Sequence, residues 1–348
     1  MSTAQILFNK DASLLISNFL REQSFTQLGV VVDNNTKTHC YSLVKDALPT
    51  HSLVEVNAGE ESKNLETCTQ IWKQLTDLNF DRHSFLLVIG GGVLGDMAGF
   101  CAATYKRGIN FALVPTTLLA QVDASVGGKL GIDFLHFKNQ IGVFQEPVAT
   151  LISSSFLKTL PERELRSGFA EVIKHCIIAD KEMWDSISRK TLLEQDWDQL
   201  IAHSVNIKKK ITEEDPREQG LRKILNFGHT IGHALETHYL AMDMRIFHGE
   251  AIAMGMIMEG FIAFEKGLLS EVELTSICRF ISSIFAKTKQ PVNYTQVVGL
   301  MTQDKKNKGD KILMALPNGL GQAVWDQEVS VAEIRDAFKH YEGLWYKS

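Results

Sequence analysis

Residues 85–105 read Phe85-Leu-Leu-Val-Ile-Gly90-Gly-Gly-Val-Leu-Gly95-Asp-Met-Ala-Gly-Phe-Cys-Ala-Ala-Thr-Tyr105. The order of an apolar run, a glycine turn and an alanine-rich segment predicts a buried strand, a tight turn and a helix. Gly90, Gly92 and Gly95 have the Gly-x-Gly-x-x-Gly spacing, which in this context favours a dinucleotide, because backbone N–H groups and a helix N-terminus can approach the pyrophosphate. The acid that usually follows about 20 residues later to hold the ribose is absent, so the match is partial.

The segments on either side of this stretch continue the alternation. Apolar runs occur at residues 28–33, 111–114 and 150–153, and helical patterns at 61–78 and 96–105. Such alternation predicts a parallel sheet flanked by helices. From Pro161 onward strand signals largely disappear, and helical periodicity recurs at residues 171–178, 200–211, 221–239, 250–264 and 271–284, with a late hairpin around residues 312–325.

Length and composition bound the class of protein. At 348 residues the chain exceeds the about 250–300 residues over which single cores keep growing, so two domains are expected. The net charge of −5 gives no basic stripe for nucleic acid. Five widely spaced cysteines favour reduced thiols in a cytoplasm, and no apolar run is long enough to span a membrane. Neither secretion nor membrane insertion is expected.

A second cluster is rich in histidines: Asn226-Phe-Gly-His229-Thr-Ile-Gly-His233-Ala-Leu-Glu236, followed by Phe247-His248-Gly-Glu250. If residues 225–240 are helical, His229 and His233 lie on one face, and His248 at the start of the next helix could complete a metal site. The alternative is a pair of buried, hydrogen-bonded histidines, and the spacing alone does not exclude it.

A third cluster, Asp123-Ala-Ser-Val-Gly-Gly-Lys129-Leu-Gly-Ile-Asp133 with Lys138-Asn139, combines glycines, lysines and an amide. Lysines beside glycine turns commonly bind phosphates, although alone this segment is more typical of a solvated loop. Together, the order and the amino-acid sequences of the three clusters resemble those of the family of 3-dehydroquinate synthases. The resemblance covers the chain from about Gly59 to Trp325.

The resemblance implies a fold, cofactors and a reaction. It implies an α/β Rossmann-like NAD-binding domain over residues 1–160 and a mainly α-helical metal- and substrate-binding domain over residues 161–348, with the active site in the cleft between them. The implied substrate is 3-deoxy-D-arabino-heptulosonate 7-phosphate, an anionic sugar phosphate. The implied products are 3-dehydroquinate and phosphate, formed by transient NAD oxidation, elimination, reduction and aldol closure. A homodimer in the cytoplasm is also implied, with no nucleic-acid partner.

The resemblance also places functional residues. A divalent Zn²⁺ or Co²⁺ would be held by Glu171, His229 and His248, so that His233 becomes a catalytic residue beside the metal and not the second ligand that its spacing suggested. Lys174 and Asp123 join it as catalytic positions. Substrate contacts fall on Arg107 (across a dimer interface), Lys129, Asn139, Lys208, Arg222 and Asn226, with one of Lys305 and Lys306. NAD contacts fall on Asp33, Glu60, Lys63, Gly92, Val93, Leu94, Gly95, Asp96, Thr116, Thr117, Lys129, Lys138, Phe156, Leu157, Lys158 and Thr159.

Three alternatives remain. A metal-dependent polyol dehydrogenase shares the expected fold and cofactor but does not need so many cations. A sister sugar phosphate cyclase, such as one like 2-deoxy-scyllo-inosose synthase, shares most of the metal site. A cofactor-binding scaffold without activity predicts a broken metal triad. The pairing of Lys208 with Arg222, which would bind a carboxylate, favours the dehydroquinate branch.

Overall fold

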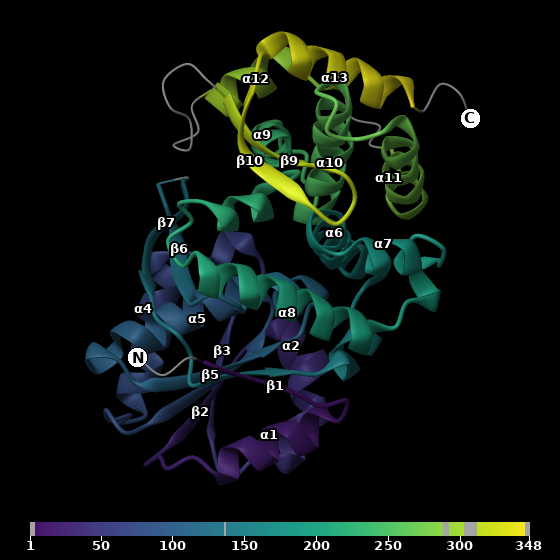
Figure 1. The fold of residues 1–348 in the computed structure, drawn as a ribbon. Helices are drawn as coiled ribbons and strands as arrows, with labels where there is room; N and C mark the ends of the chain where they lie inside the picture. Colours follow the sequence, from purple (N-terminus) through teal and green to yellow (C-terminus); the bar gives the residue numbers. More distant parts are fainter. Residues whose placement is uncertain (1–3, 136, 288–291, 303–311, 345–348) are drawn as a thin grey trace. The chain divides into compact units, whose positions relative to one another are not determined.

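The computed structural model describes residues 4–135, 137–287, 292–302 and 312–344 (Figure 1). The chain divides into two compact units. The first unit comprises residues 1–165 and 197–205, and the second unit comprises residues 166–196 and 206–348. Helix α8 (Trp197–Glu214) contributes to both units.

The first unit is built on a six-stranded sheet with the order β1-β8-β5-β4-β2-β3, in which every neighbouring pair is parallel. The predicted apolar strands are confirmed as β2 (Leu28–Asp33), β4 (Phe85–Gly90), β5 (Asn110–Pro115) and β8 (Ala149–Ile152). The edge strands β1 (Gln5–Phe8) and β3 (Ser52–Val56) were not predicted, because they are short and partly exposed.

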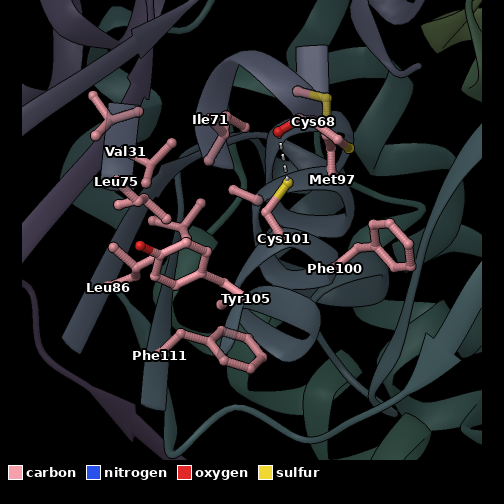
Figure 2. Close-up of a cluster of buried hydrophobic side chains, with 14 of the residues drawn as sticks. Val31, Cys68, Ile71, Leu75, Leu86, Met97, Phe100, Cys101, Tyr105 and Phe111 are labelled. Carbon is pink, nitrogen blue, oxygen red and sulfur yellow. Dashed lines mark hydrogen bonds between the residues drawn. The ribbon is translucent and has the colours of Figure 1, made fainter. Parts of the chain in front are cut away.

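Both faces of the sheet are covered by helices. Val31, Leu86 and Val88 pack with α4 (Leu65–Asp77) and α5 (Gly92–Thr104), and Figure 2 shows part of this cluster around Ile71, Leu75 and Cys101. The alternate strand residues Val30, Leu87 and Ile89 pack with α1 (Ala12–Arg21). Burial on both faces explains why these strands read as continuous apolar runs.

A two-stranded antiparallel ribbon follows β5 in the chain. It consists of β6 (Lys129–Phe134) and β7 (Phe137–Phe144). The expectation of a loop for this glycine-rich segment, taken alone, is therefore wrong for residues 129–133 and 138–139, whereas residues 125–128 lie in a turn. Leu130 and Ile132 of β6 enter the same core as α4 and α5, whereas most of β7 is exposed, and this one-sided burial weakens the sequence pattern of a strand.

The second unit is mainly helical, as expected from the sequence. Its helices include α6 (Glu162–Ala179), α7 (Lys181–Ile187), α9 (His229–Ala241), α10 (His248–Glu265), α11 (Glu271–Ile284), α12 (Tyr294–Thr302) and α13 (Val331–Gly343). The predicted late hairpin is present as the antiparallel pair β9 (Ile312–Pro317) and β10 (Ala323–Val329). In the described part of the chain, no helix combines the length and hydropathy required to cross a bilayer.

The single helix predicted over residues 221–239 is interrupted, so that prediction is wrong at its centre. Residues Leu221–Asn226 form a 3₁₀ helix, Phe227 and Gly228 form a turn, and α9 begins at His229. Gly228 between them has φ +78°, a left-handed conformation that costs glycine little. The apolar spacing continued through the break, which is why periodicity did not reveal it.

Candidate metal and cofactor sites

Three helices of the second unit bring the proposed metal ligands together. Glu171 lies in the middle of α6 and is fully buried, while His229 and His248 are the first residues of α9 and α10. The Nε2 atoms of His229 and His248 lie 3.5 Å and 3.6 Å from Glu171 Oε1. Ligand atoms about 2.0–2.1 Å from a tetrahedral zinc lie about 3.3–3.4 Å apart, so this spacing fits a shared metal ion.

The hydrogen bonding of Glu171 also fits a metal ligand. Its Oε2 atom accepts from the Lys174 ammonium, which is itself buried. Its Oε1 atom, although buried, has no hydrogen-bond partner among the described residues. Burying a carboxylate oxygen without a hydrogen-bond partner raises the free energy of the folded state, and a cation beside the oxygen would offset this penalty.

The second ring nitrogens of the two histidines are held by acceptors. His229 Nδ1 lies 3.1 Å from the carbonyl oxygen of Phe227, and His248 Nδ1 lies 3.3 Å from Glu236 Oε2. A proton on each Nδ1 leaves the Nε2 lone pair for a metal, which is the usual outer-shell arrangement of metal-binding imidazoles. Glu236 was not assigned a role from the sequence. Its position twelve residues before His248 carries no periodic signal.

The contacts within the cluster shift the pKa values of Glu171, His229 and His248. Burial raises the pKa of Glu171, but the Lys174 ammonium and the two histidines outweigh burial and hold that pKa well below its usual range. Burial and Lys174 hold the pKa of His229 well below its usual range, so this ring is neutral. Burial lowers the pKa of His248, but the nearby carboxylates of Glu171 and Glu236 raise it to about 9, so metal binding must displace a proton there.

His233 lies beside the same cluster. Its ring centroid is 5.0 Å from that of His229 and 5.6 Å from that of His248, and one nitrogen of each ring falls within 4.8 Å of the others. Geometry therefore offers Glu171 or His233 as the third ligand. We favour Glu171, because its buried Oε1 needs a cation, whereas His233 is exposed and can exchange protons with solvent or substrate.

Close backbone contacts fix the helices that carry these ligands. A Cβ added to Gly249 would lie 2.0 Å from the carbonyl oxygen of Ser167 on α6, and the Gly249 N–H donates to Ser167 Oγ at 3.0 Å. The start of α10 is thus held against α6 one turn before Glu171. Only glycine allows this approach.

The glycine turn of the first unit has the predicted context. It joins the end of β4 to the start of α5, with Gly91 as the residue before the helix. Asp33 ends β2 and Thr116 follows β5, with the Thr116 N–H donating to the Gly90 carbonyl at 3.0 Å. These residues lie near one another because the carboxyl ends of neighbouring parallel strands lie at the same end of the sheet. Sheets of this kind bind nucleotides at that end.

Gly95, in the first turn of α5, differs from the other glycines of this helix. A Cβ at Gly95 would meet no atom of the described chain within 4 Å, whereas one at Gly92 would lie 3.0 Å from the Cβ of Ala124 and one at Gly99 2.6 Å from Leu130. The space beside Gly95 is therefore open within the described chain.

A buried lysine connects two groups of predicted residues in the first unit. Lys63, 4% exposed, donates to Asp96 Oδ2 and to Asn139 Oδ1, each at 2.7 Å. Asn139 has φ +50°, and its N–H donates to Asp133 Oδ1 at 2.7 Å. The structure thus brings two predicted cofactor residues together with a predicted substrate residue on β7.

The other predicted substrate residues differ in their surroundings. Lys208 and Arg222 are buried in the second unit, and an Arg222 guanidinium nitrogen (Nη1) donates to the Pro216 carbonyl at 2.9 Å. Asn226 donates to Glu218 Oε1 at 2.8 Å. In the first unit, Lys129 begins β6 and is exposed.

The remaining predicted residues are placed as follows. Asp123 lies in η5 (Ala120–Ala124), Arg107 ends η4 (Tyr105–Arg107) with φ +69°, Glu60 in η3 (Glu60–Ser62) pairs with Lys138 at 3.7 Å, Val93 and Leu94 lie in α5, Thr117 follows Thr116, and Phe156, Leu157, Lys158 and Thr159 lie in η6 (Ser154–Thr159). Lys305 and Lys306 lie outside the described residues.

Comparison with known proteins gives consistent matches. The family described as 3-dehydroquinate synthase N-terminal matches residues 53–167, and that described as 3-dehydroquinate synthase C-terminal matches residues 168–307. A 3-dehydroquinate synthase of Parabacteroides distasonis is 36% identical over 347 residues, which cover 98% of each chain.

Solved structures agree in fold. The chain superimposes with a TM-score of 0.88 and 25% identity on 2-epi-5-epi-valiolone synthase from Streptomyces hygroscopicus subsp. jinggangensis, solved with NAD⁺ and Zn²⁺ bound, covering 99% of this chain and 98% of that one. A 2-deoxy-scyllo-inosose synthase complexed with carbaglucose-6-phosphate, NAD⁺ and Co²⁺ gives a TM-score of 0.85 at 24% identity, covering 96% of both chains. Since the two matched families adjoin and the bacterial relative spans nearly the whole sequence, the chain belongs to the 3-dehydroquinate synthase family.

Proposed function

We propose that this chain converts 3-deoxy-D-arabino-heptulosonate 7-phosphate to 3-dehydroquinate and phosphate, as a carbon–oxygen lyase that uses NAD and Zn²⁺ or Co²⁺. The observation that carries the proposal is the buried Glu171 Oε1, which lacks a hydrogen-bond partner among the described residues and faces His229 and His248. This donor set of one carboxylate and two imidazoles suits a catalytic divalent ion with open positions for substrate hydroxyls.

The cofactors would supply two kinds of chemistry when bound: NAD would accept and return a hydride in one turnover, and the metal would polarise the oxygen of the alcohol that is oxidised. The chain's own residues bind and orient the substrate and move protons. His233, exposed beside the two ligand histidines, is placed to exchange a proton with substrate. Lys174 holds the second oxygen of Glu171, which keeps Oε1 directed at the metal position.

We assign the two anionic groups of the substrate to cationic and amide side chains. Arg222 and Lys208 of the second unit would bind its carboxylate, since both are buried and a guanidinium can bind a carboxylate through two hydrogen bonds. Its phosphate would bind Asn226, together with Lys129 and Asn139 of the first unit and Lys305 or Lys306. Lys63 would support the Asn139 contact, because its ammonium donates to Asn139 Oδ1 and leaves the amide NH₂ group to donate to the phosphate.

We further propose a cytoplasmic homodimer in which Arg107 of the partner subunit reaches the substrate phosphate. Arg107 is exposed, and it lies between Lys106 and Gly108 in a run of three residues with positive φ. Such a backbone costs energy in residues other than glycine, and it is commonly retained where a side chain must be directed to a ligand.

The proposed reaction can be assayed directly. Protein supplied with NAD and Zn²⁺ should release phosphate from the heptulosonate phosphate and form product while no NADH accumulates. Accumulation of NADH in proportion to product would instead identify a dehydrogenase, and failure to release phosphate would exclude the proposed lyase.

The carboxylate contact distinguishes this reaction from those of sister cyclases. Lysine at position 222 keeps the charge but cannot form the planar, bidentate pair, and it also loses the bond to the Pro216 carbonyl. We expect Arg222→Lys to raise KM and lower kcat/KM by on the order of tenfold or more, equivalent to about 1.4 kcal/mol of lost charge-assisted hydrogen bonding. Steady-state kinetics with the heptulosonate phosphate measures this.

Arg217→Lys is the matched control, because it makes the same change at an exposed position five residues earlier. Wild-type protein should also show no useful turnover of glucose 6-phosphate or sedoheptulose 7-phosphate, which offer Arg222 no carboxylate. Equal turnover of either sugar phosphate, or an Arg222→Lys variant that behaves like wild type, would reassign the chain to a sister cyclase.

A further inference from the structure

Glu259 is a fully buried carboxylate in the otherwise apolar stretch of α10 from Ala251 to Gly260. Its two oxygens accept hydrogen bonds from the first turn of the neighbouring helix. Oε2 accepts from the Gly228 N–H at 2.6 Å, and Oε1 accepts from the Ile231 N–H at 2.9 Å. No role was given to Glu259 from the sequence, although a lone acid within an apolar helix is a signal of a buried partner.

These hydrogen bonds act at the position of His229. The start of a helix leaves backbone N–H groups without partners, and Gly228 supplies no side chain to cap α9. Glu259 therefore caps α9 from another helix, and a carboxylate is also favoured at the positive end of the helix dipole. In the sequence, His229 lies between Gly228 and Ile231, whose N–H groups donate to Glu259. Glu259 therefore fixes the backbone from which the His229 imidazole projects.

The contact between α9 and α10 leaves little room for adjustment. A Cβ at Gly255, one turn before Glu259, would lie 2.0 Å from the Gly228 carbonyl oxygen and 3.0 Å from the Gly232 nitrogen. The two backbones thus touch at this point. Since α10 also begins with His248, one helix carries a proposed ligand at its start and holds the helix of another proposed ligand further along.

We propose that Glu259 is a positioning residue of the metal centre, which sets the direction of His229 by binding the first turn of α9. This inference rests on the metal ligands given under the proposed function. It predicts that loss of the carboxylate weakens metal binding even when the protein remains folded, because outer-shell partners typically contribute about 10- to 100-fold in metal affinity.

The test is Glu259→Gln, which keeps the size of the side chain but places an amide NH₂ group against one of the two N–H donors. We expect Zn²⁺ affinity, measured by competition with a chelator in the absence of substrate, to fall about 10- to 100-fold. Hydrogen exchange of the Gly228 and Ile231 amides should accelerate. Glu259→Asp, which keeps the charge on a shorter side chain, should lose less affinity and provides a second variant if the first does not fold.

Glu273→Gln is the matched control. Glu273 also accepts two backbone N–H bonds in the second unit, from Ser270 and Leu320, but it caps α11, which carries no proposed ligand. Both Gln variants should lower the melting temperature, and only Glu259→Gln should lower metal affinity. Unchanged Zn²⁺ affinity in folded Glu259→Gln, equal losses in both variants, or failure of both Glu259 variants to fold would overturn the positioning role. Absence of Zn²⁺ binding by wild type would overturn the metal site itself.

Discussion

Glu171→Ala, His229→Ala and His248→Ala are each expected to lose tightly bound metal and, with it, turnover. The three atoms converge from α6, α9 and α10, and a site with three protein ligands cannot lose one and retain its affinity. Glu171→Ala carries an additional cost, because it leaves the buried Lys174 ammonium without its carboxylate. Metal content after gel filtration, measured by inductively coupled plasma mass spectrometry, checks the result, and chelation of wild type should abolish activity in the same way.

His233→Ala is the matched control among the clustered histidines, and the opposite result is expected. The variant should keep its metal and lose turnover, because an exposed imidazole beside the metal serves proton transfer. General acid–base groups typically contribute about 10²- to 10⁴-fold to rate. A His233→Ala variant without metal, combined with a Glu171→Ala variant that retains it, would show that the three histidines form the metal site.

Gly95→Val is expected to abolish NAD binding while the fold is kept. The added side chain enters space that no atom of the described chain occupies, and valine is compatible with the helical backbone of α5. We expect the pyrophosphate to approach the backbone in this space. Isothermal titration with NAD measures the effect, and circular dichroism confirms the fold.

Gly299→Val provides the control for this substitution. Gly299 lies in α12, and a Cβ there also meets no atom of the described chain within 4 Å, but the helix belongs to the second unit and has no predicted NAD contact. The control should bind NAD like wild type. Unchanged NAD affinity in Gly95→Val would remove the glycine turn from the cofactor site.

The parts of the fold that could be predicted are those in which local pattern and tertiary environment agree. The strand, turn and helix at residues 85–105 were predictable because β4 is buried on both faces and α5 follows a glycine at once. The ribbon of β6 and β7 did not show as strands, because its exposed residues remove the apolar alternation. The same holds for β1 and β3 at the edges of the sheet.

The site was less predictable than the fold, because its residues meet through packing between distant segments. Helical spacing suggested His229 and His233 as the ligand pair, but it did not reveal the break at Gly228, where α9 closely approaches α10 at Gly255. Glu171 has no spacing relation to either histidine, and only the family resemblance indicated it. The structure brings Glu171, His229 and His248 together, and their role as metal ligands stays a prediction.

The division of the predicted ligand contacts between the two units has a thermodynamic consequence. Every predicted NAD contact lies in the first unit, and Glu171, His229 and His248 all lie in the second. A ligand at 100 times its dissociation constant adds about 2.7 kcal/mol to the stability of the structure that binds it. If these contacts are correct, we expect each cofactor to raise the free energy of unfolding of a different unit. Calorimetric scans with NAD alone and with Zn²⁺ alone then report how strongly the unfolding of the two units is coupled. A single transition whose midpoint rises with either ligand means that the units unfold cooperatively. Two transitions, one raised only by NAD and the other only by Zn²⁺, mean that the units unfold separately.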